Sequence, residues 1–144
     1  MSQNRFDETA SLRIRGEPSE LSSVRQHVEE QARAVGFSDA ETGKIALAVD
    51  EALANVIRHG YGGPCDRPID ITIEQVQWAQ EVAIAITIRD FGQQVDPADI
   101  AGRMLEDVRP GGLGVHIIHA VMDEVTYTPA QGGGMQLVMK KKLP

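Results

Sequence analysis

The apolar positions near the N-terminus change from a period of two to a helical period. Leu12 and Ile14 alternate with polar residues over 9–15, and this alternation predicts a half-buried strand. Pro18 then stands where helices commonly open, and Gly36 supplies a C-terminal stop. Between them, apolar residues recur at helical spacing at Leu21, Val24, Val28, Ala32 and Val35. The pattern therefore predicts a strand followed by an amphipathic helix.

A second helix is predicted to begin at Ser38 and to run to about His59. Ser38 and Glu41 have the Ser-x-x-Glu spacing of a capping box, and Gly60 can end the helix. The residues expected on its buried face are Ile45, Val49, Ala52, Leu53 and Val56.

Glu51 and Asn55 lie one turn apart on a stripe that borders this buried face, and Arg58 follows on the same stripe. At such a border a carboxylate can meet a ligand and accept a proton, and an amide oxygen is a neutral ligand suited to Mg²⁺. Taken alone, Glu-x-x-x-Asn is more typical of a solvated helix face. The pair gains meaning only from the rest of the chain.

The C-terminal half returns mainly to the strand pattern. Strands are predicted over 69–74, 82–88, 124–128 and 135–141, and a helix over 115–122. The first two strands are expected to form an antiparallel pair that breaks near Ala79-Gln80. Residues 93–111 lack a sustained period and are interpreted as a loop or lid, with a short helix over 97–105.

Two glycine-containing segments stand at the ends of predicted elements. Asp90 follows a strand, with Gly92 two residues later. Gly112-Leu113-Gly114 precedes a helix, where free backbone N–H groups and the helix dipole favour a phosphate. Each segment alone is more often a simple turn. Their order after the Glu51 stripe would be an unusual coincidence in a chain this short, and this order carries the resemblance to a known family.

Composition narrows the class of protein. The 144 residues fit one domain, with 42% hydrophobic and 24% charged residues. No apolar run reaches the roughly 18 residues of a membrane span, and the N-terminal residues lack the apolar region of a signal peptide. We therefore expect a cytoplasmic protein without a membrane partner.

Charge and cysteine content exclude further classes. The net charge of −7 and a pI near 5.0 argue against a broad surface for nucleic acid, so proteins are the expected partners. Cys65 has no intrachain partner and is interpreted as a loop thiol. The run Lys140-Lys141-Lys142 is interpreted as a solvated strand end.

The ordered motifs resemble the nucleotide-binding module of the GHKL ATPases, which include DNA gyrase, histidine kinases and MutL. Within that superfamily the chain is most similar to the small bacterial anti-sigma factor serine/threonine protein kinases of the RsbW and SpoIIAB type. Three segments carry the likeness, which covers nearly the whole chain: Asp-Glu-Ala-Leu-Ala-Asn-Val-Ile-Arg-His-Gly-Tyr over 50–61, Gly-Gly-Leu-Gly-Val-His-Ile-Ile over 111–118 and Met-Asp-Glu-Val over 122–125.

The resemblance implies a Bergerat-type α/β two-layer sandwich, with helices on one face of a mixed, mainly antiparallel sheet. It implies that Asp90 hydrogen-bonds the adenine amino group of ATP or ADP, that Gly92 allows close approach, and that Asn55 holds Mg²⁺. Glu51 would be the general base for a protein serine. Backbone amides of Gly112, Leu113 and Gly114 would reach the phosphates. Arg58 and His59 are either contacts near the phosphates or ribose, or residues of a solvated helix end.

Two positions depart from the family pattern. Gln94 replaces the second glycine of Asp-x-Gly-x-Gly, and Met135 follows Gly134 where the family often has threonine.

The resemblance also implies partners. The first hypothesis is an anti-sigma factor that sequesters a sigma factor and phosphorylates a serine on its anti-anti-sigma (STAS-type) antagonist. The second is a module that binds nucleotide and sequesters a partner without phosphotransfer. A histidine phosphotransferase is less favoured, because no helical hairpin with a phospho-acceptor histidine is predicted. A homodimer, formed through the first helix and the strand over 9–15, is implied by the likeness alone.

Overall fold

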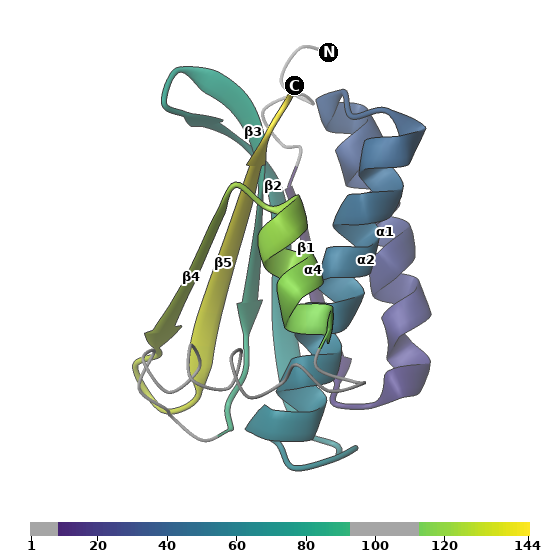
Figure 1. Ribbon diagram of the computed structural model, residues 1–144. Helices are drawn as coiled ribbons and strands as arrows, with labels where there is room; N and C mark the ends of the chain where they lie inside the picture. The colour runs from purple at the N-terminus through teal and green to yellow at the C-terminus, as the bar shows by residue number, and fades with distance from the viewer. Residues whose placement is uncertain (1–8, 93–112) are drawn as a thin grey trace.

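Within residues 9–92 and 113–144, the part that the computed structural model describes, five strands form one sheet and α-helices cover one of its faces (Figure 1). The strands are β1 (Thr9–Arg15), β2 (Pro68–Trp78), β3 (Glu81–Arg89), β4 (Glu124–Pro129) and β5 (Met135–Lys142). Their order is β1-β2-β3-β5-β4, and all four pairings are antiparallel. The predicted α/β sandwich is confirmed, and its described strands form an antiparallel rather than a mixed sheet. The predicted lid over 93–111 lies outside the described residues.

The helices on the covered face are α1 (Leu21–Val35), α2 (Asp39–Asn55) and α4 (Leu113–Val121). A 3₁₀ turn, η2 (Pro18–Glu20), precedes α1. Figure 1 shows α2 between the other two helices, and it contacts both of them. No helix in the described ranges combines the length and the apolar character needed to cross a membrane.

The core lies between these helices and every second residue of the central strands. The buried isoleucines of β2 and β3 are Ile69, Ile71, Ile73, Ile84, Ile86 and Ile88. The register places Ile71 beside Ile88 and Ile73 beside Ile86, so their side chains stack on the face that the helices cover. The alternation in the sequence therefore predicted both the strands and the face that they bury.

The start of α2 is capped as the sequence predicts. Ser38 Oγ accepts a hydrogen bond from the Glu41 backbone N–H at 3.2 Å. The Glu41 carboxylate lies 3.6 Å from the Lys141 ammonium on β5, so it also links this helix to the sheet.

The helical run that carries the Glu51 stripe changes geometry after Asn55. It continues as a π-helical turn, η3 (Val56–Gly60), and the Tyr61 N–H donates to the Val56 carbonyl at 2.9 Å. The predicted extent of the helix to about residue 59 is confirmed. The change from an α-helix to a wider π-helical turn was not predicted from the sequence. Such π segments are frequent at functional sites, because they turn the following side chains relative to a regular α-helix.

The lysines at the end of β5 are not a solvated terminus. The side chains of Lys140, Lys141 and Lys142 are mostly buried, and each lies within 4 Å of a carboxylate: Glu124, Glu41 and Glu81, respectively. The interpretation from sequence was wrong because these acids come from three elements that are distant along the chain. The run joins β5 to its neighbours.

The hairpin between β2 and β3 turns through two residues that rarely adopt the required backbone. Ala79 has a φ of 53° and Gln80 a φ of 69°, in the left-handed region that asparagine and glycine prefer. We expect Ala79→Asn/Gln80→Gly to raise the free energy of unfolding by about 1 kcal/mol, because it relieves both positions. Urea denaturation measures the change.

The matched control for this hairpin is Gln77→Gly, at an exposed position of β2. It should lower the stability by about 0.5–1 kcal/mol, since a glycine inside a strand adds only freedom to the unfolded chain. An Asn-Gly hairpin no more stable than the wild type would contradict the assignment of strain to this turn.

Candidate nucleotide-binding site

Asp90 is a buried carboxylate at the end of β3, with 5% of its surface exposed. Its Oδ1 accepts hydrogen bonds from the backbone N–H of Gly92 at 2.9 Å and from that of Met135 at 3.2 Å. Its own N–H donates to the Met135 carbonyl at 3.0 Å. Because a buried carboxylate must be hydrogen-bonded to be tolerated, these contacts fix the orientation of the side chain.

Two glycines allow three segments to meet around Asp90. A Cβ at Gly92 would lie 2.3 Å from the Gly60 carbonyl oxygen, and a Cβ at Gly134 would lie 2.0 Å from the Asp90 carbonyl oxygen. No side chain fits at either place, and Gly134 also has a φ of +79°. The end of η3, the end of β3 and the start of β5 are therefore in direct contact.

The other carboxylate oxygen of Asp90 lies toward η3. A Cβ added at Gly60 would be 3.6 Å from Asp90 Oδ2 and 3.7 Å from a methyl group of Val56. The helical run that carries the Glu51 stripe therefore ends beside Asp90. The sequence pattern had placed Asp90 only at the end of a strand and gave no sign of this contact.

Glu51 and Asn55 are partly buried on α2, at the predicted border between core and solvent. Asn55 Oδ1 accepts a hydrogen bond from Arg58 Nη2 at 2.8 Å, which confirms that the two residues share a stripe. Arg58 and His59 are exposed on η3.

The amide oxygen of Asn55 remains able to serve a cation. An amide oxygen has two lone pairs, and Arg58 uses one of them from an exposed position. The donor is hard, neutral and at the edge of the core, which fits Mg²⁺. Among residues 9–92 and 113–144, no group of three or more His, Cys, Asp or Glu side chains could hold a metal ion.

The remaining predicted site residues belong to the segment before and within α4. Leu113 and Gly114 are helical residues of α4. Gly112 lies outside the described residues, so its predicted contact with phosphate stays a prediction.

Sequence reasoning missed one group that holds Asp90 and one that holds the residue after it. The backbone N–H of Met135 contacts the carboxylate directly, in the place where the family often has a threonine. The Tyr61 hydroxyl accepts a hydrogen bond from the Phe91 N–H at 3.0 Å, and burial raises the pKa of Tyr61. The only signal in the sequence was the position of Tyr61, directly after the predicted helix and its terminal glycine.

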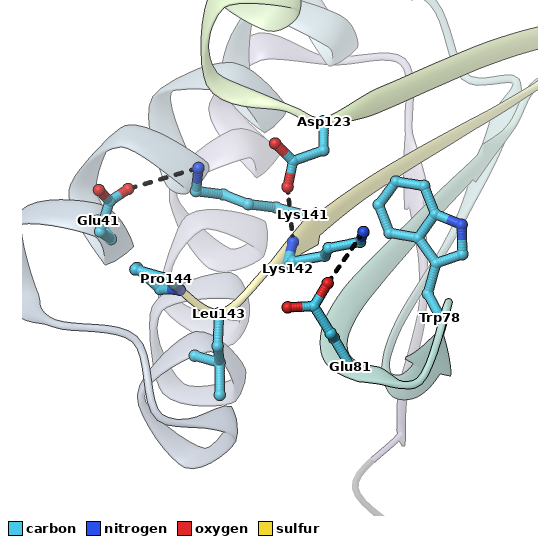
Figure 2. A pocket seen from close by; sticks show the side chains of 8 residues that line it. All are labelled: Glu41, Trp78, Glu81, Asp123, Lys141, Lys142, Leu143 and Pro144. Carbon is cyan, nitrogen blue, oxygen red and sulfur yellow. Dashed lines mark hydrogen bonds and ion pairs between the residues drawn. The ribbon is translucent and has the colours of Figure 1, made fainter.

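A polar cleft of about 540 Å³ lies elsewhere, beside the end of β5 and the β2–β3 hairpin (Figure 2). Its lining residues are Glu41, Trp78, Glu81, Asp123, Lys141, Lys142, Leu143 and Pro144. None of them is a predicted site residue. Figure 2 shows the lysines directed at carboxylates, so the charges of this cleft largely satisfy one another.

Comparison with known proteins agrees with the resemblance read from the sequence. A family model described as the histidine kinase-like ATPase domain matches residues 14–141. The serine-protein kinase RsbW of Listeria monocytogenes serovar 1/2a is 27% identical over 138 residues, covering 91% of this chain and 85% of the relative. The anti-sigma F factor of Clostridium novyi is 32% identical over 103 residues, covering 69% of each.

A solved structure supports the fold independently. The crystal structure of the RsbU and RsbW domains of a Mycobacterium tuberculosis protein matches with a TM-score of 0.60 at 14% identity. The match covers 94% of this chain and 32% of that longer chain. The sequence motifs, the two-layer sandwich and these relatives agree: the chain belongs to the histidine kinase-like ATPase family, and within it to the RsbW and SpoIIAB type of anti-sigma factor kinases.

Proposed function

We propose that this chain is a cytoplasmic anti-sigma factor that binds Mg-ATP around Asp90 and phosphorylates a serine on an anti-anti-sigma (STAS-type) protein. In this role it sequesters a sigma factor until its antagonist is present in the unphosphorylated form. The observation that supports it most is the buried carboxylate of Asp90, fixed by two backbone N–H groups beside the helical run that carries Glu51 and Asn55.

Asp90 is suited to read an adenine base. Its Oδ1 is occupied by the N–H groups of Gly92 and Met135, which leaves Oδ2 to accept a hydrogen bond from an exocyclic amino group. Both groups that hold the carboxylate are backbone atoms, so the support does not depend on a hydroxyl at position 135. This is how the chain can keep the function with Met135 in place of threonine.

The phosphates would lie near the Asn55 stripe. Asn55 would hold Mg²⁺, and the ion, when bound, would neutralise charge on the phosphates. Arg58, released from Asn55, would then be free to contact a phosphate or the ribose, and exposed His59 is placed next to it. Backbone amides of Gly112, Leu113 and Gly114 would bind phosphate oxygens at the start of α4.

Glu51 is proposed as the general base. As the serine Oγ forms a bond to the γ-phosphorus, the bond from that phosphorus to the bridging oxygen breaks and ADP leaves. The hydroxyl proton passes to the Glu51 carboxylate. The position of Glu51 one turn before Asn55 places the base and the proposed Mg²⁺ ligand on the same stripe of α2.

A homodimer through α1 and β1 remains part of the proposal. β1 lies at one edge of the sheet, where its outer backbone groups can pair with another strand.

The contact between Arg58 and Asn55 favours one rival function. If Arg58 keeps its hydrogen bond to the amide oxygen at all times, the positive charge of its guanidinium opposes a cation at the second lone pair of that oxygen. The chain would then be a nucleotide-binding module that sequesters its partner without transferring phosphate.

Substitution of Asn55 tests the assignment of the Mg²⁺ ligand. We expect Asn55→Ala to weaken ATP binding about tenfold in the presence of magnesium and to change it little in excess EDTA, because only the metal-dependent part is lost. Titration calorimetry measures both affinities. Gln77→Ala, which removes an exposed amide from β2, is the control and should match the wild type. Equal magnesium dependence in Asn55→Ala and wild type would support the rival module.

Substitution of Glu51 tests the chemistry. We expect Glu51→Gln to reduce serine phosphorylation by about 10²- to 10⁴-fold and to leave ATP affinity within a factor of about two, because the amide keeps the shape but cannot accept the proton. Radiolabelled ATP and an antagonist protein from the same genome provide the assay. The control Asp66→Asn removes an exposed carboxylate from the loop before β2, and this variant should label the antagonist normally. Undiminished labelling by Glu51→Gln would remove Glu51 from the mechanism.

A further inference from the structure

Tyr61, the residue directly after η3, packs between the backbone at Gly16 and the backbone at Gly92. A Cβ at Gly16 would lie 3.0 Å from one edge of its ring, and a Cβ at Gly92 would lie 3.0 Å from the other. The guanidinium of Arg67 lies over the ring, 5.0 Å from its centre. The ring is thus held on both edges and on one face.

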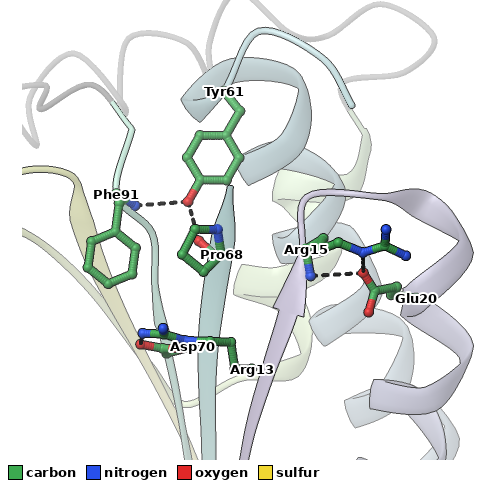
Figure 3. A network of polar contacts seen from close by, with 7 residues as sticks. All are labelled: Arg13, Arg15, Glu20, Tyr61, Pro68, Asp70 and Phe91. Atoms are coloured by element: carbon green, nitrogen blue, oxygen red, sulfur yellow. Dashed lines mark hydrogen bonds and ion pairs between the residues drawn. The ribbon is translucent and has the colours of Figure 1, made fainter. Parts of the chain in front are cut away.

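The hydroxyl of Tyr61 makes two hydrogen bonds with defined directions (Figure 3). It accepts from the Phe91 N–H at 3.0 Å and donates its single proton to the Pro68 carbonyl at the start of β2. A tyrosine hydroxyl carries its proton at neutral pH, and burial raises the pKa of Tyr61 further. The Tyr61 hydroxyl therefore links the Phe91 N–H, just after β3, to the first residue of β2.

The Phe91 N–H belongs to the peptide group that follows Asp90. The direction of this peptide plane sets the ψ angle of Asp90 and therefore places the residues that follow, including the Gly92 N–H that holds the Asp90 carboxylate at 2.9 Å. Gly134 packs against the carbonyl oxygen of the same peptide, at a distance that admits no Cβ. Tyr61 and Gly134 thus hold the two ends of one peptide plane.

The next peptide is also held. Arg67 donates a hydrogen bond to the Phe91 carbonyl, and the Gly92 N–H donates to Asp90 Oδ1 at 2.9 Å. Arg67 therefore braces both the ring of Tyr61 and the residue whose N–H the hydroxyl binds.

We infer that Tyr61, braced by Arg67, is a positioning residue for base recognition: it fixes the peptide after Asp90 so that the carboxylate points at the 6-amino group of the purine. This inference rests on the proposed function, in which Asp90 accepts a hydrogen bond from adenine. It predicts that the loss of the Tyr61 hydroxyl, whose two hydrogen bonds are to backbone groups of Pro68 and Phe91, selectively weakens discrimination between purine bases.

The test compares two nucleotides that differ at the atom that Asp90 would read. Titration calorimetry measures the affinities for ADP and for inosine diphosphate, which carries an oxygen in place of the 6-amino group. Wild type should prefer ADP by about tenfold or more, as expected for a lost hydrogen bond to a charged group. Tyr61→Phe should lose about three- to tenfold in ADP affinity and keep its inosine diphosphate affinity, so the ratio falls.

Tyr127→Phe is the matched control, because it removes a hydroxyl from a partly buried tyrosine on β4 and leaves the segment around Asp90 untouched. Its nucleotide ratio should equal that of the wild type. If Tyr61→Phe does not fold, Arg67→Met replaces it, since the loss of the bond to the Phe91 carbonyl should lower the same ratio.

The outcomes separate the inference from the proposed function. Absence of ADP binding by the wild type would refute the proposed function itself. A wild type that prefers ADP, with a variant that keeps the same ratio, would overturn the inference alone. An equal loss of both affinities in the variant would likewise overturn it, because it would show only a general structural role for Tyr61.

Discussion

A carboxylate that is withdrawn from water needs hydrogen-bond donors, and the donors that Asp90 uses organise this end of the protein. Gly92 and Met135 supply two backbone N–H groups to one oxygen of the carboxylate. To reach it, the start of β5 must run against the end of β3, which is possible because Gly134 has no side chain. The same requirement brings Gly60 against Gly92. The donors to Asp90 are thus backbone N–H groups, which can reach it because Gly92 and Gly134 have no side chains.

The helix that carries the proposed chemistry is coupled to this acid by its own geometry. α2 is regular as far as Asn55 and then widens into the π-helical turn that ends at Gly60, beside Asp90 Oδ2. The end of this helical run at Gly60 and the buried acid at Asp90, about 30 positions apart in the sequence, therefore lie side by side. On this helical run Arg58 donates a hydrogen bond to the Asn55 side chain. Whether the chain is a kinase or a sequestering module therefore depends on how readily Arg58 gives up this hydrogen bond in favour of a magnesium ion.

Much of this arrangement could be predicted from the sequence, and the reasons for success and failure are physical. Periodicity predicted the strands and helices because burial acts on every second or every third to fourth residue. The Ser38 cap and the border position of Asn55 are local features, so they were confirmed. Contacts between distant segments have no local signal: neither the ion pair of Lys141 with Glu41 nor the N–H of Met135 on Asp90 could be read from a pattern. Tyr61 was visible only as an aromatic residue after a glycine.

Asp90 is the group proposed to recognise the base, and the rest of the proposed site depends on it. The most direct measurement is a calorimetric titration of Mg-ADP into wild type and Asp90→Asn, with Asp66→Asn in the exposed loop as the matched control. The side-chain oxygen of an asparagine can still accept hydrogen bonds from both backbone N–H groups. Its NH₂ group, however, would face the amino group of adenine, and two donors cannot form a hydrogen bond. We predict tight binding by wild type and Asp66→Asn, and a loss of at least about tenfold in Asp90→Asn. Equal affinities in all three proteins, or no heat with the wild type, would contradict the account.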